Sequence, residues 1–274
     1  MSGSNGNCYY IGNAMRGILI DAGVSVRTIR KRLGDIGIGF ENLYGIFVTH
    51  DHYDHVKAVS KLSEKHNIPV YTTPAIFEGI NRIPHVRPKL YNSRKNITVN
   101  EPVHLGEFTI TAFPVSHDAT ESLGYTIEYR NERFTLATDL GYICENSAEH
   151  IRKANFLVIE SNFDDEMLEN GSYPEFLKRR INCETGHLSN NETAEFLSEN
   201  YHAGLKHIFL CHLSRQNNTP EKAYETTAEK LKSKGIIVVS SASATVANTE
   251  VPEAETVKLT VLNRTMPTGE FFLD

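Results

Sequence analysis

The stretch GIFVTHDHYDHV, residues 45–56, joins an apolar run to a dense group of metal-binding residue types. The run GIFV is typical of a buried strand, because it is continuous and rich in β-branched and aromatic residues. Directly after it come His50, His52, Asp54 and His55. A solvated polar loop is the alternative explanation. The ordered spacing His-x-His-x-Asp-His arises by chance in about one chain per thousand, so it favours a metal site.

Apolar runs that end in histidine or aspartate recur along the chain. GILID ends at Asp21, AFPVSH at His117, TLATD at Asp139 and IFLCH at His212. Taken singly, each of these residues is more simply a turn or capping residue. A divalent cation, however, needs imidazole and carboxylate ligands that converge from several elements, and a pair of ions needs about seven of them. The strand ends together therefore predict a metal centre that draws its ligands from these histidines and aspartates.

The bulk composition limits the class of protein. The chain has 274 residues, 40% of them hydrophobic, and a net charge of −6, so its surface as a whole does not attract nucleic acid. It has no apolar run long enough to span a membrane and no signal-peptide pattern. Four widely spaced cysteines without a CxxC motif indicate reduced thiols and a cytoplasmic location. Basic clusters at 27–32, 87–95 and 177–180 are either solvated faces or a phosphate-binding rim around a site.

Strand-like and helix-like segments alternate in both halves of the chain. Helical patterns cover 25–38, 55–67, 74–83, 190–203 and 219–235, and a further helix precedes the strand in 150–164. The remaining apolar segments predict strands, among them 96–100, 107–117, 122–130, 133–141 and the tail segments 257–263 and 270–274. We expect an α/β protein with a two-sheet core and helices outside, as one domain over 1–274 in which residues 255–274 form an extension that adds edge strands.

The order Asp21, His50/His52/Asp54/His55, His117, Asp139, His212 resembles the metallo-β-lactamase superfamily over nearly the whole chain. The resemblance implies a four-layer αββα sandwich that holds two divalent ions (Zn, Mn or Fe). It implies His50, His52 and His117 on one ion, and Asp54, His55 and His212 on the other. Asp139 would lie between the ions, and Asp21 would orient a ligand histidine.

The segments LVIESNFD and CETGHLSNNETA, between Asp139 and His212, resemble the corresponding segments of ribonuclease Z enzymes. Glu160 and His187 match a pair that assists phosphodiester cleavage in those enzymes. A glutamate-supported histidine can protonate the leaving oxygen, and the start of the helix at 188–197 can offer N–H groups to phosphoryl oxygens. Simpler explanations are a capping or packing histidine and a strand-end carboxylate.

A narrower resemblance is carried by SGSNGNCYYI, TGHLSNNE and CHLSRQNNTPE, which are similar to the YycJ/WalJ-like exonuclease branch. That branch implies a dinuclear nuclease acting on DNA 5′ ends, although this chain lacks the apolar segment that precedes SGSxGNC there, so its first edge strand is expected to be missing. The implied residues at the site mouth are Ser4, Asn5, Asn7, Ser214, Asn217 and Asn218. Ordinary turn chemistry explains the same residue types equally well.

The sequence therefore predicts a cytoplasmic dinuclear metal-dependent phosphodiesterase, most simply a 5′ to 3′ DNA exonuclease. Hydroxide from a metal-bound water would attack phosphorus, Asp54 would orient it, and His187 with Glu160 would protonate the leaving group. DNA is the expected partner, with no membrane and no obligatory protein partner. Two alternatives remain: a hydrolase of thioesters, lactones or small cyclic phosphodiesters, and a non-catalytic relative that binds nucleic acid.

Overall fold

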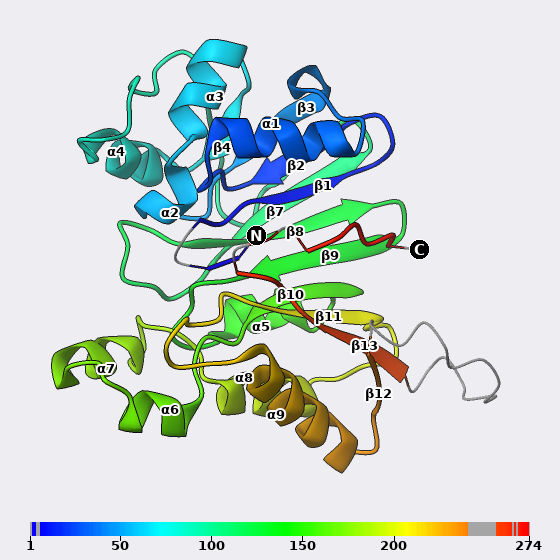
Figure 1. Cartoon of the computed structure of the whole chain (residues 1–274). Helices are drawn as coiled ribbons and strands as arrows, with labels where there is room; N and C mark the ends of the chain where they lie inside the picture. Colours follow the sequence, from blue (N-terminus) through cyan, green and yellow to red (C-terminus); the bar gives the residue numbers. More distant parts are fainter. Residues whose placement is uncertain (1, 4–5, 241–255, 265, 267, 274) are drawn as a thin grey trace.

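The computed structural model describes residues 2–3, 6–240, 256–264, 266 and 268–273, and within them the chain forms two packed β-sheets with helices outside (Figure 1). The first sheet has five strands in the order β1-β2-β3-β4-β5. These strands are β1 (Tyr9–Gly12), β2 (Gly17–Ile20), β3 (Leu43–Phe47), β4 (Val70–Thr72) and β5 (Arg94–Asn96). The pairing of β1 with β2 is antiparallel, and the other pairings are parallel.

The second sheet has eight strands in the described residues, in the order β12-β13-β11-β10-β9-β8-β7-β6. These are β6 (Pro102–Leu105), β7 (Phe108–Pro114), β8 (Leu123–Tyr129), β9 (Glu132–Ala137), β10 (Phe156–Glu160), β11 (His207–Cys211), β12 (Ile237–Ser240) and β13 (Thr256–Val261). The strands from β6 to β9 are antiparallel, whereas β9, β10, β11, β13 and β12 run parallel.

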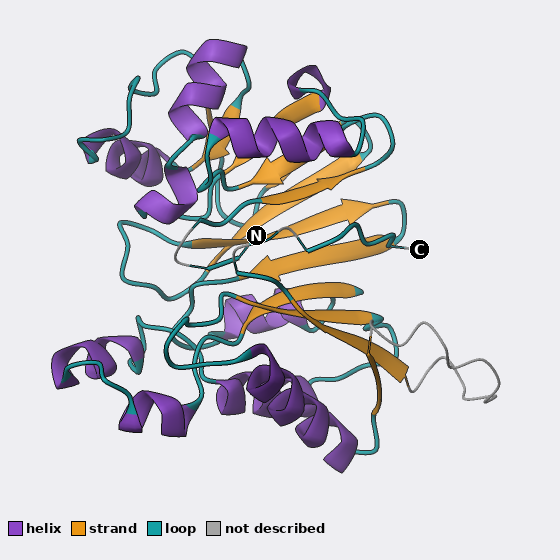
Figure 2. Ribbon diagram, viewed as in Figure 1, coloured by secondary structure: helices purple, strands orange, loops and turns teal. Residues whose placement is uncertain are grey.

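The helices cover the outer faces of the two sheets, as Figure 2 shows. On the first sheet lie α1 (Val26–Asp35), α2 (Tyr53–Val56), α3 (Val59–His66) and α4 (Pro74–Arg82). On the side of the second sheet lie α5 (Glu145–Ile151), α6 (Asp165–Asn170), α7 (Glu175–Ile181), α8 (Asn190–Glu199) and α9 (Pro220–Ser233). None of the helices described is long and apolar enough to cross a membrane.

Two hydrophobic clusters hold these layers together. The larger joins the first sheet to its helices and to the inner face of the second sheet, with Ile46, Leu62 and Tyr125 among its fully buried members. The smaller joins the outer face of the second sheet to α5, α8 and α9, with Leu157 and Leu231 among its members. The predicted αββα sandwich is confirmed.

Strand direction brings the polar strand ends together. In the parallel part of the second sheet, Ile159 pairs with Ala137 and Glu160 pairs with Cys211. The carboxyl ends of β9, β10 and β11 therefore lie at one edge, where Asp139, Glu160 and His212 follow or end their strands. This is the edge where open α/β sheets place their ligand sites.

Several elements differ from the prediction. The helix expected over 55–67 is divided into α2 and α3. The Ala22 N–H donates to the His55 carbonyl and the Ala22 carbonyl accepts from the Ala58 N–H, and these two bonds interrupt the hydrogen bonding of the helix. Strand β5 ends at Asn96, where the expected strand over 96–100 was to begin. Strand β13 lies between β11 and β12, not at an edge of the sheet, and residues 270–273 form no strand. Four elements of the described residues were not expected: β6, α6, α7 and a short 3₁₀ helix over Phe40–Asn42.

Candidate metal centre

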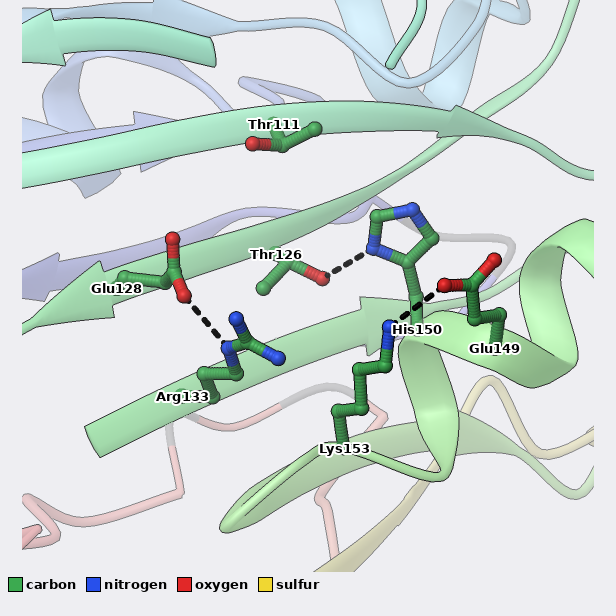
Figure 3. A pocket seen from close by; sticks show the side chains of 7 residues that line it. All are labelled: Thr111, Thr126, Glu128, Arg133, Glu149, His150 and Lys153. Atoms are coloured by element: carbon green, nitrogen blue, oxygen red, sulfur yellow. Dashed lines mark hydrogen bonds and ion pairs between the residues drawn. The ribbon is translucent and has the colours of Figure 1, made fainter. Parts of the chain in front are cut away.

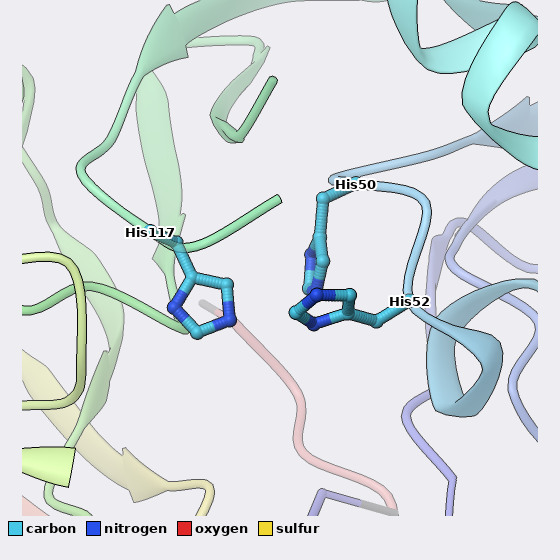
Figure 4. A group of neighbouring side chains, drawn as sticks. All are labelled: His50, His52 and His117. Atoms are coloured by element: carbon cyan, nitrogen blue, oxygen red, sulfur yellow. The ribbon is translucent and has the colours of Figure 1, made fainter. Parts of the chain in front are cut away.

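His50, His52 and His117 form the first group of possible ligands (Figure 4). One ligand atom from each lies within 4.8 Å of the others. His50 and His52 come from the loop after β3, and His117 comes from the loop after β7, so the two sheets face each other here. The His50 Nε2 atom is buried and has no hydrogen-bond partner among the described residues. An unpartnered buried nitrogen beside two further imidazoles fits a divalent metal ion.

Asp54, His55 and His212 form a second group, with ligand atoms again within 4.8 Å of one another. Asp139 lies between the two groups. Its Oδ1 is 3.9 Å from His117 Nε2, and its Oδ2 is 3.5 Å from His55 Nε2. The structure thus brings all seven predicted ligands together, in the grouping that the superfamily resemblance implies, and the donor set fits a pair of ions with a carboxylate between them.

The Nδ1 atoms of four of these histidines already have acceptors. His55 Nδ1 donates to Asp21 Oδ2 at 2.7 Å, and His117 Nδ1 donates to the Gly186 carbonyl at 3.0 Å. His212 Nδ1 donates to Glu160 Oε1 at 2.7 Å, and His50 Nδ1 lies 3.0 Å from Thr49 Oγ1. Because an imidazole that donates through Nδ1 keeps its lone pair on Nε2, these contacts select Nε2 as the metal-binding atom.

Thr49 is a site residue that the sequence analysis missed. Its hydroxyl donates to Asp21 Oδ2 at 2.8 Å, and its backbone N–H donates to Asp21 Oδ1 at 2.9 Å. The same hydroxyl contacts the rings of His50 and His55, so Thr49 and Asp21 together orient two ligands. Its position directly before His50 was the only available signal. Burial alone would lower the pKa of His55, but the charges of Asp21 and Asp139 raise it to about 9.

Glu160 serves two histidines, not only the predicted one. Its Oε1 accepts from His187 Nδ1 at 2.8 Å and from His212 Nδ1 at 2.7 Å, while its Oε2 accepts from the Leu140 N–H at 2.9 Å. Burial alone would raise the pKa of Glu160, but His187 and His212 lower it to about 2. Asn162 is a further residue that the sequence analysis missed, since its amide donates to Glu160 Oε1 and to the His212 carbonyl.

Three of the predicted site residues adopt a left-handed backbone. Asp21, Asp139 and His212 have φ values of 58°, 56° and 55°. This region is uncommon for residues other than glycine, although aspartate and histidine enter it more readily than most. Each of the three follows a strand of the sheet core, so the left-handed turn ends the strand and directs its side chain toward the centre.

The predicted mouth residues that the structure describes are largely buried. Ser4 and Asn5 lie outside the described residues. Asn7, Asn217 and Asn218 are at most 2% exposed, so they do not line an open surface. Asn7 Nδ2 lies 2.8 Å from His55 Nε2, on the inner side of the ligand set. The Asn218 amide donates to the Ser161 and Asn162 carbonyls, so it joins its own loop to the segment that follows β10. Ser214 is half-buried, and its hydroxyl accepts from the Asn217 N–H.

The start of α8 does not offer the predicted set of N–H donors. The Asn190 N–H donates to the Phe163 carbonyl at 2.7 Å. The Glu192 N–H donates to Ser189 Oγ, and the Glu192 carboxylate returns a contact to the Ser189 N–H. This capping box occupies the N–H groups of Ser189 and Glu192 and places a negative charge in the first turn, so the binding of phosphoryl oxygens by α8 stays a prediction that this geometry does not favour.

Another hollow lies on the outer face of the second sheet, beside α5 (Figure 3). It is polar, but its charges are paired with each other: Arg133 with Glu128, and Lys153 with Glu149. His150 bonds Thr126 there. None of the predicted ligands lines this hollow. The chemistry of the molecule is therefore expected at the strand-end cluster.

Comparisons with known proteins agree with this fold. A family model described as a β-lactamase superfamily domain matches residues 16–213. The chain is 35% identical over 235 residues to Exodeoxyribonuclease YycJ of Bacillus anthracis, covering 85% of this chain and 88% of that protein. It is 34% identical over 231 residues to Exodeoxyribonuclease WalJ of Streptococcus pneumoniae, covering 84% of this chain and 86% of that protein.

Solved structures share the fold at low sequence identity. The metallo-β-lactamase fold protein YhfI of Bacillus subtilis aligns with a TM-score of 0.64 and 16% identity, covering 94% of this chain and 92% of YhfI. Zinc-bound PqqB of Methylobacterium extorquens aligns with a TM-score of 0.62 and 17% identity, covering 82% of each chain. The chain belongs to the metallo-β-lactamase superfamily, in the branch of the exodeoxyribonucleases YycJ and WalJ.

Proposed function

We propose that this protein is a dinuclear metal-dependent phosphodiesterase that degrades DNA from its ends, in the 5′ to 3′ direction. The two relatives of about one-third identity are both named exodeoxyribonucleases, which supports the reaction and the substrate. The observation that carries the proposal is the pair Glu160 and His187 beside the ligand set, because a phosphodiester needs a proton donor at its leaving oxygen.

The proposed metal sites follow the geometry. His50, His52 and His117 would hold one ion, Asp54, His55 and His212 the other, and Asp139 both. Zn, Mn and Fe all accept imidazole and carboxylate ligands. When bound, such ions supply a water of lowered pKa and neutralise charge on the phosphoryl oxygens.

His187 is the proposed proton donor. Its Nδ1 is bound to Glu160, so Nε2 is the atom that carries the transferable proton. The His187 ring lies 5.0 Å from the His117 ring and 5.2 Å from the His212 ring, centroid to centroid, and its side chain is 22% exposed. The fully buried carboxylate of Glu160 stabilises the positive charge that a protonated His187 carries before transfer.

Asp54 is proposed to orient the attacking water as well as to bind metal. Its Oδ2 lies 3.8 Å from His55 Nε2, and its side chain is only partly buried. A cytoplasmic location is also proposed, because Cys8, Cys144, Cys183 and Cys211, all within the described residues, form no disulfide, as expected in a reducing compartment.

The test compares His187→Ala with the unaltered protein on DNA labelled at the 5′ or the 3′ end. His187→Ala is expected to lower turnover by about 10²-fold or more while two metal ions per chain remain bound. Unchanged DNA hydrolysis by this variant would refute the acid role. Release of label only from 5′ ends supports the polarity. A protein that hydrolyses a thioester but neither DNA nor bis-p-nitrophenyl phosphate would refute the nuclease proposal.

A further inference from the structure

Helix α7 ends against the loops that carry the predicted ligands. The Ser116 hydroxyl donates to the Glu184 carbonyl at 2.7 Å, and the Gly141 N–H donates to the Ser116 carbonyl at 2.9 Å. A Cβ atom on Gly141 would lie 2.4 Å from the Cys183 carbonyl oxygen, so the segment after α7 packs directly on the loop after β9. These contacts fix the carboxyl end of α7 beside the metal centre.

Arg180, in the last turn of α7, is held close to the ligand histidines. Its Nε lies 2.7 Å from Asp118 Oδ2, and its second guanidinium contact to the same oxygen is 2.6 Å. The other oxygen, Asp118 Oδ1, lies 3.4 Å from His117 Nε2 and 3.9 Å from His52 Nε2. One carboxylate thus joins Arg180 to the metal-binding edge of the first histidine group.

The guanidinium keeps capacity for a ligand. Arginine has five N–H donors in a planar fork, and only those on Nε and one terminal nitrogen contact Asp118. The Arg180 side chain is 62% exposed, so a phosphate can reach the remaining donors from solvent. Arginine is the residue best suited to two-pronged recognition of phosphate.

The surface of α7 is unusual for a short helix on a folded domain. None of its residues is buried, yet it carries Phe176, which is 74% exposed. Phe176 precedes Arg180 by four residues, so the two side chains lie on the same face, about 6 Å apart along the helix axis. Lys178, between them in sequence, is instead bound to the Glu169 carbonyl and the Glu175 carboxylate. One face of α7 therefore combines an exposed ring with an exposed cation beside the catalytic centre.

We propose that α7 is the wall of the site that binds a single-stranded DNA end: Arg180, positioned by Asp118, binds a phosphate adjacent to the scissile one, and Phe176 stacks on an unpaired base. The inference rests on the proposed nuclease function. A single strand is favoured over a duplex because the faces of paired bases are stacked and closed to a side chain. Alternating contacts to phosphate and base faces are the usual way in which single strands are bound.

The base contact is tested by removing the base from the DNA and the Phe176 ring from the protein, separately and together. Oligonucleotides with an abasic residue at successive positions near the 5′ end are compared with the intact strand, for the unaltered protein and for Phe176→Ala. We expect one position at which the abasic residue and Phe176→Ala each lower kcat/KM about tenfold. At that position, Phe176→Ala acting on the abasic strand should lose no more activity than either change alone. Phe272→Ala is the matched control, because Phe272 is 82% exposed and belongs to the carboxyl-terminal segment, which Figure 1 draws on the opposite side of the molecule from α7.

The phosphate contact is tested with neutral methylphosphonate linkages placed one at a time along the same strand. At the linkage that Arg180 binds, the neutral group should lower kcat/KM of the unaltered protein about tenfold and that of Arg180→Gln less than twofold. Arg180→Lys should recover part of the activity on the unmodified strand, because it keeps the charge without the fork. Arg179→Gln alters an exposed neighbour to which no role at the site is assigned; it is the control and should match the unaltered protein.

The inference would be overturned if, at every abasic position and every neutral linkage, the loss caused by the altered DNA and the loss caused by the protein variant simply multiply. A purely structural Arg180–Asp118 pair gives that result, with a lowered melting temperature or metal content in Arg180→Gln. If the unaltered protein cleaves DNA but the losses from altered DNA and from the α7 variants are independent of each other, only the role of α7 is refuted. If the unaltered protein cleaves none of these strands, the nuclease proposal fails, and the inference falls with it.

Discussion

Replacing Glu160 by glutamine separates two roles that the structure gives to one carboxylate. Glu160 is fully buried and accepts from His187 and from His212 through the same oxygen. His187 is the proposed acid, whereas His212 is a proposed metal ligand. Glutamine keeps the shape of the side chain but loses its charge, so both histidines lose their anionic partner without a cavity being formed.

The size of the effect follows from the pKa of Glu160, which burial alone would raise but which His187 and His212 lower from 4.5 to about 2. A displacement of this size corresponds to about 3 kcal/mol of net stabilisation of the charged carboxylate, which is what remains after its partners have offset the cost of burial. Such an energy equals roughly two powers of ten in an equilibrium or rate constant. We therefore expect Glu160→Gln to weaken binding of the second ion by about 10- to 100-fold, as is usual when a partner of a ligand histidine is lost.

The assay compares Glu160→Gln with His187→Ala by chelator competition and by turnover at saturating metal. His187→Ala should lose turnover and keep its metal affinity, whereas Glu160→Gln should lose both. The sensitivity to chelator is the deciding measurement, because turnover falls in either case. Glu160→Gln with the metal affinity of the unaltered protein would show that Glu160 does not orient His212, and the reasoning from the shared oxygen would be wrong.

Three further outcomes follow from other parts of the structure. Asp21→Asn removes the buried acceptor of a ligand histidine and should weaken metal binding about 10- to 100-fold in chelator competition, while unchanged affinity would contradict the orienting role. Gly23→Ala should lower the free energy of unfolding in urea by about 1–3 kcal/mol, because its Cβ would lie 1.5 Å from the Asp54 carbonyl oxygen; Gly34→Ala, with nothing within 4 Å, should lose no stability. Burial lowers the pKa of His207 to about 4, so the folded state favours its neutral form. The unaltered protein should therefore lose about 2 kcal/mol of stability between pH 6.5 and 4.5 that His207→Gln retains, and equal losses in urea titrations would refute this.

The convergence of the predicted ligands could be anticipated because its signal is local. Each ligand follows an apolar run, and His50 and His52 share one short motif. The direction of the strands then brings these residues together, since parallel strands have their carboxyl ends at the same edge. The apolar runs and their order can both be read from the sequence, and neither requires knowing which strand pairs with which.

What the sequence could not show depends on non-local pairing or on burial. Strand β13 lies inside the sheet because β11 and β12 both pair with it, and nothing in its own composition indicates two partners. Helix α7 buries no residue, so it has no apolar periodicity to detect. Asn7 and Asn218 are of a residue type that is typical of turns, and only the fold shows that both are buried.

The left-handed residues show how the fold supports the centre. At Asp21, Asp139 and His212 the chain must turn sharply out of a strand, and glycine would do so at no steric cost. Glycine has no side chain to offer, whereas each of these positions needs a carboxylate or an imidazole. The conformation costs roughly 1–2 kcal/mol per residue, and it persists because the neighbouring strands determine it. The Asp21 N–H is bonded to the Phe47 carbonyl at 2.8 Å, and the His212 N–H to Ser2 Oγ at 2.7 Å. The two hydrophobic clusters thus hold the strand ends in a conformation that the isolated segments would not adopt, and the ligands are preorganised at the expense of local backbone stability.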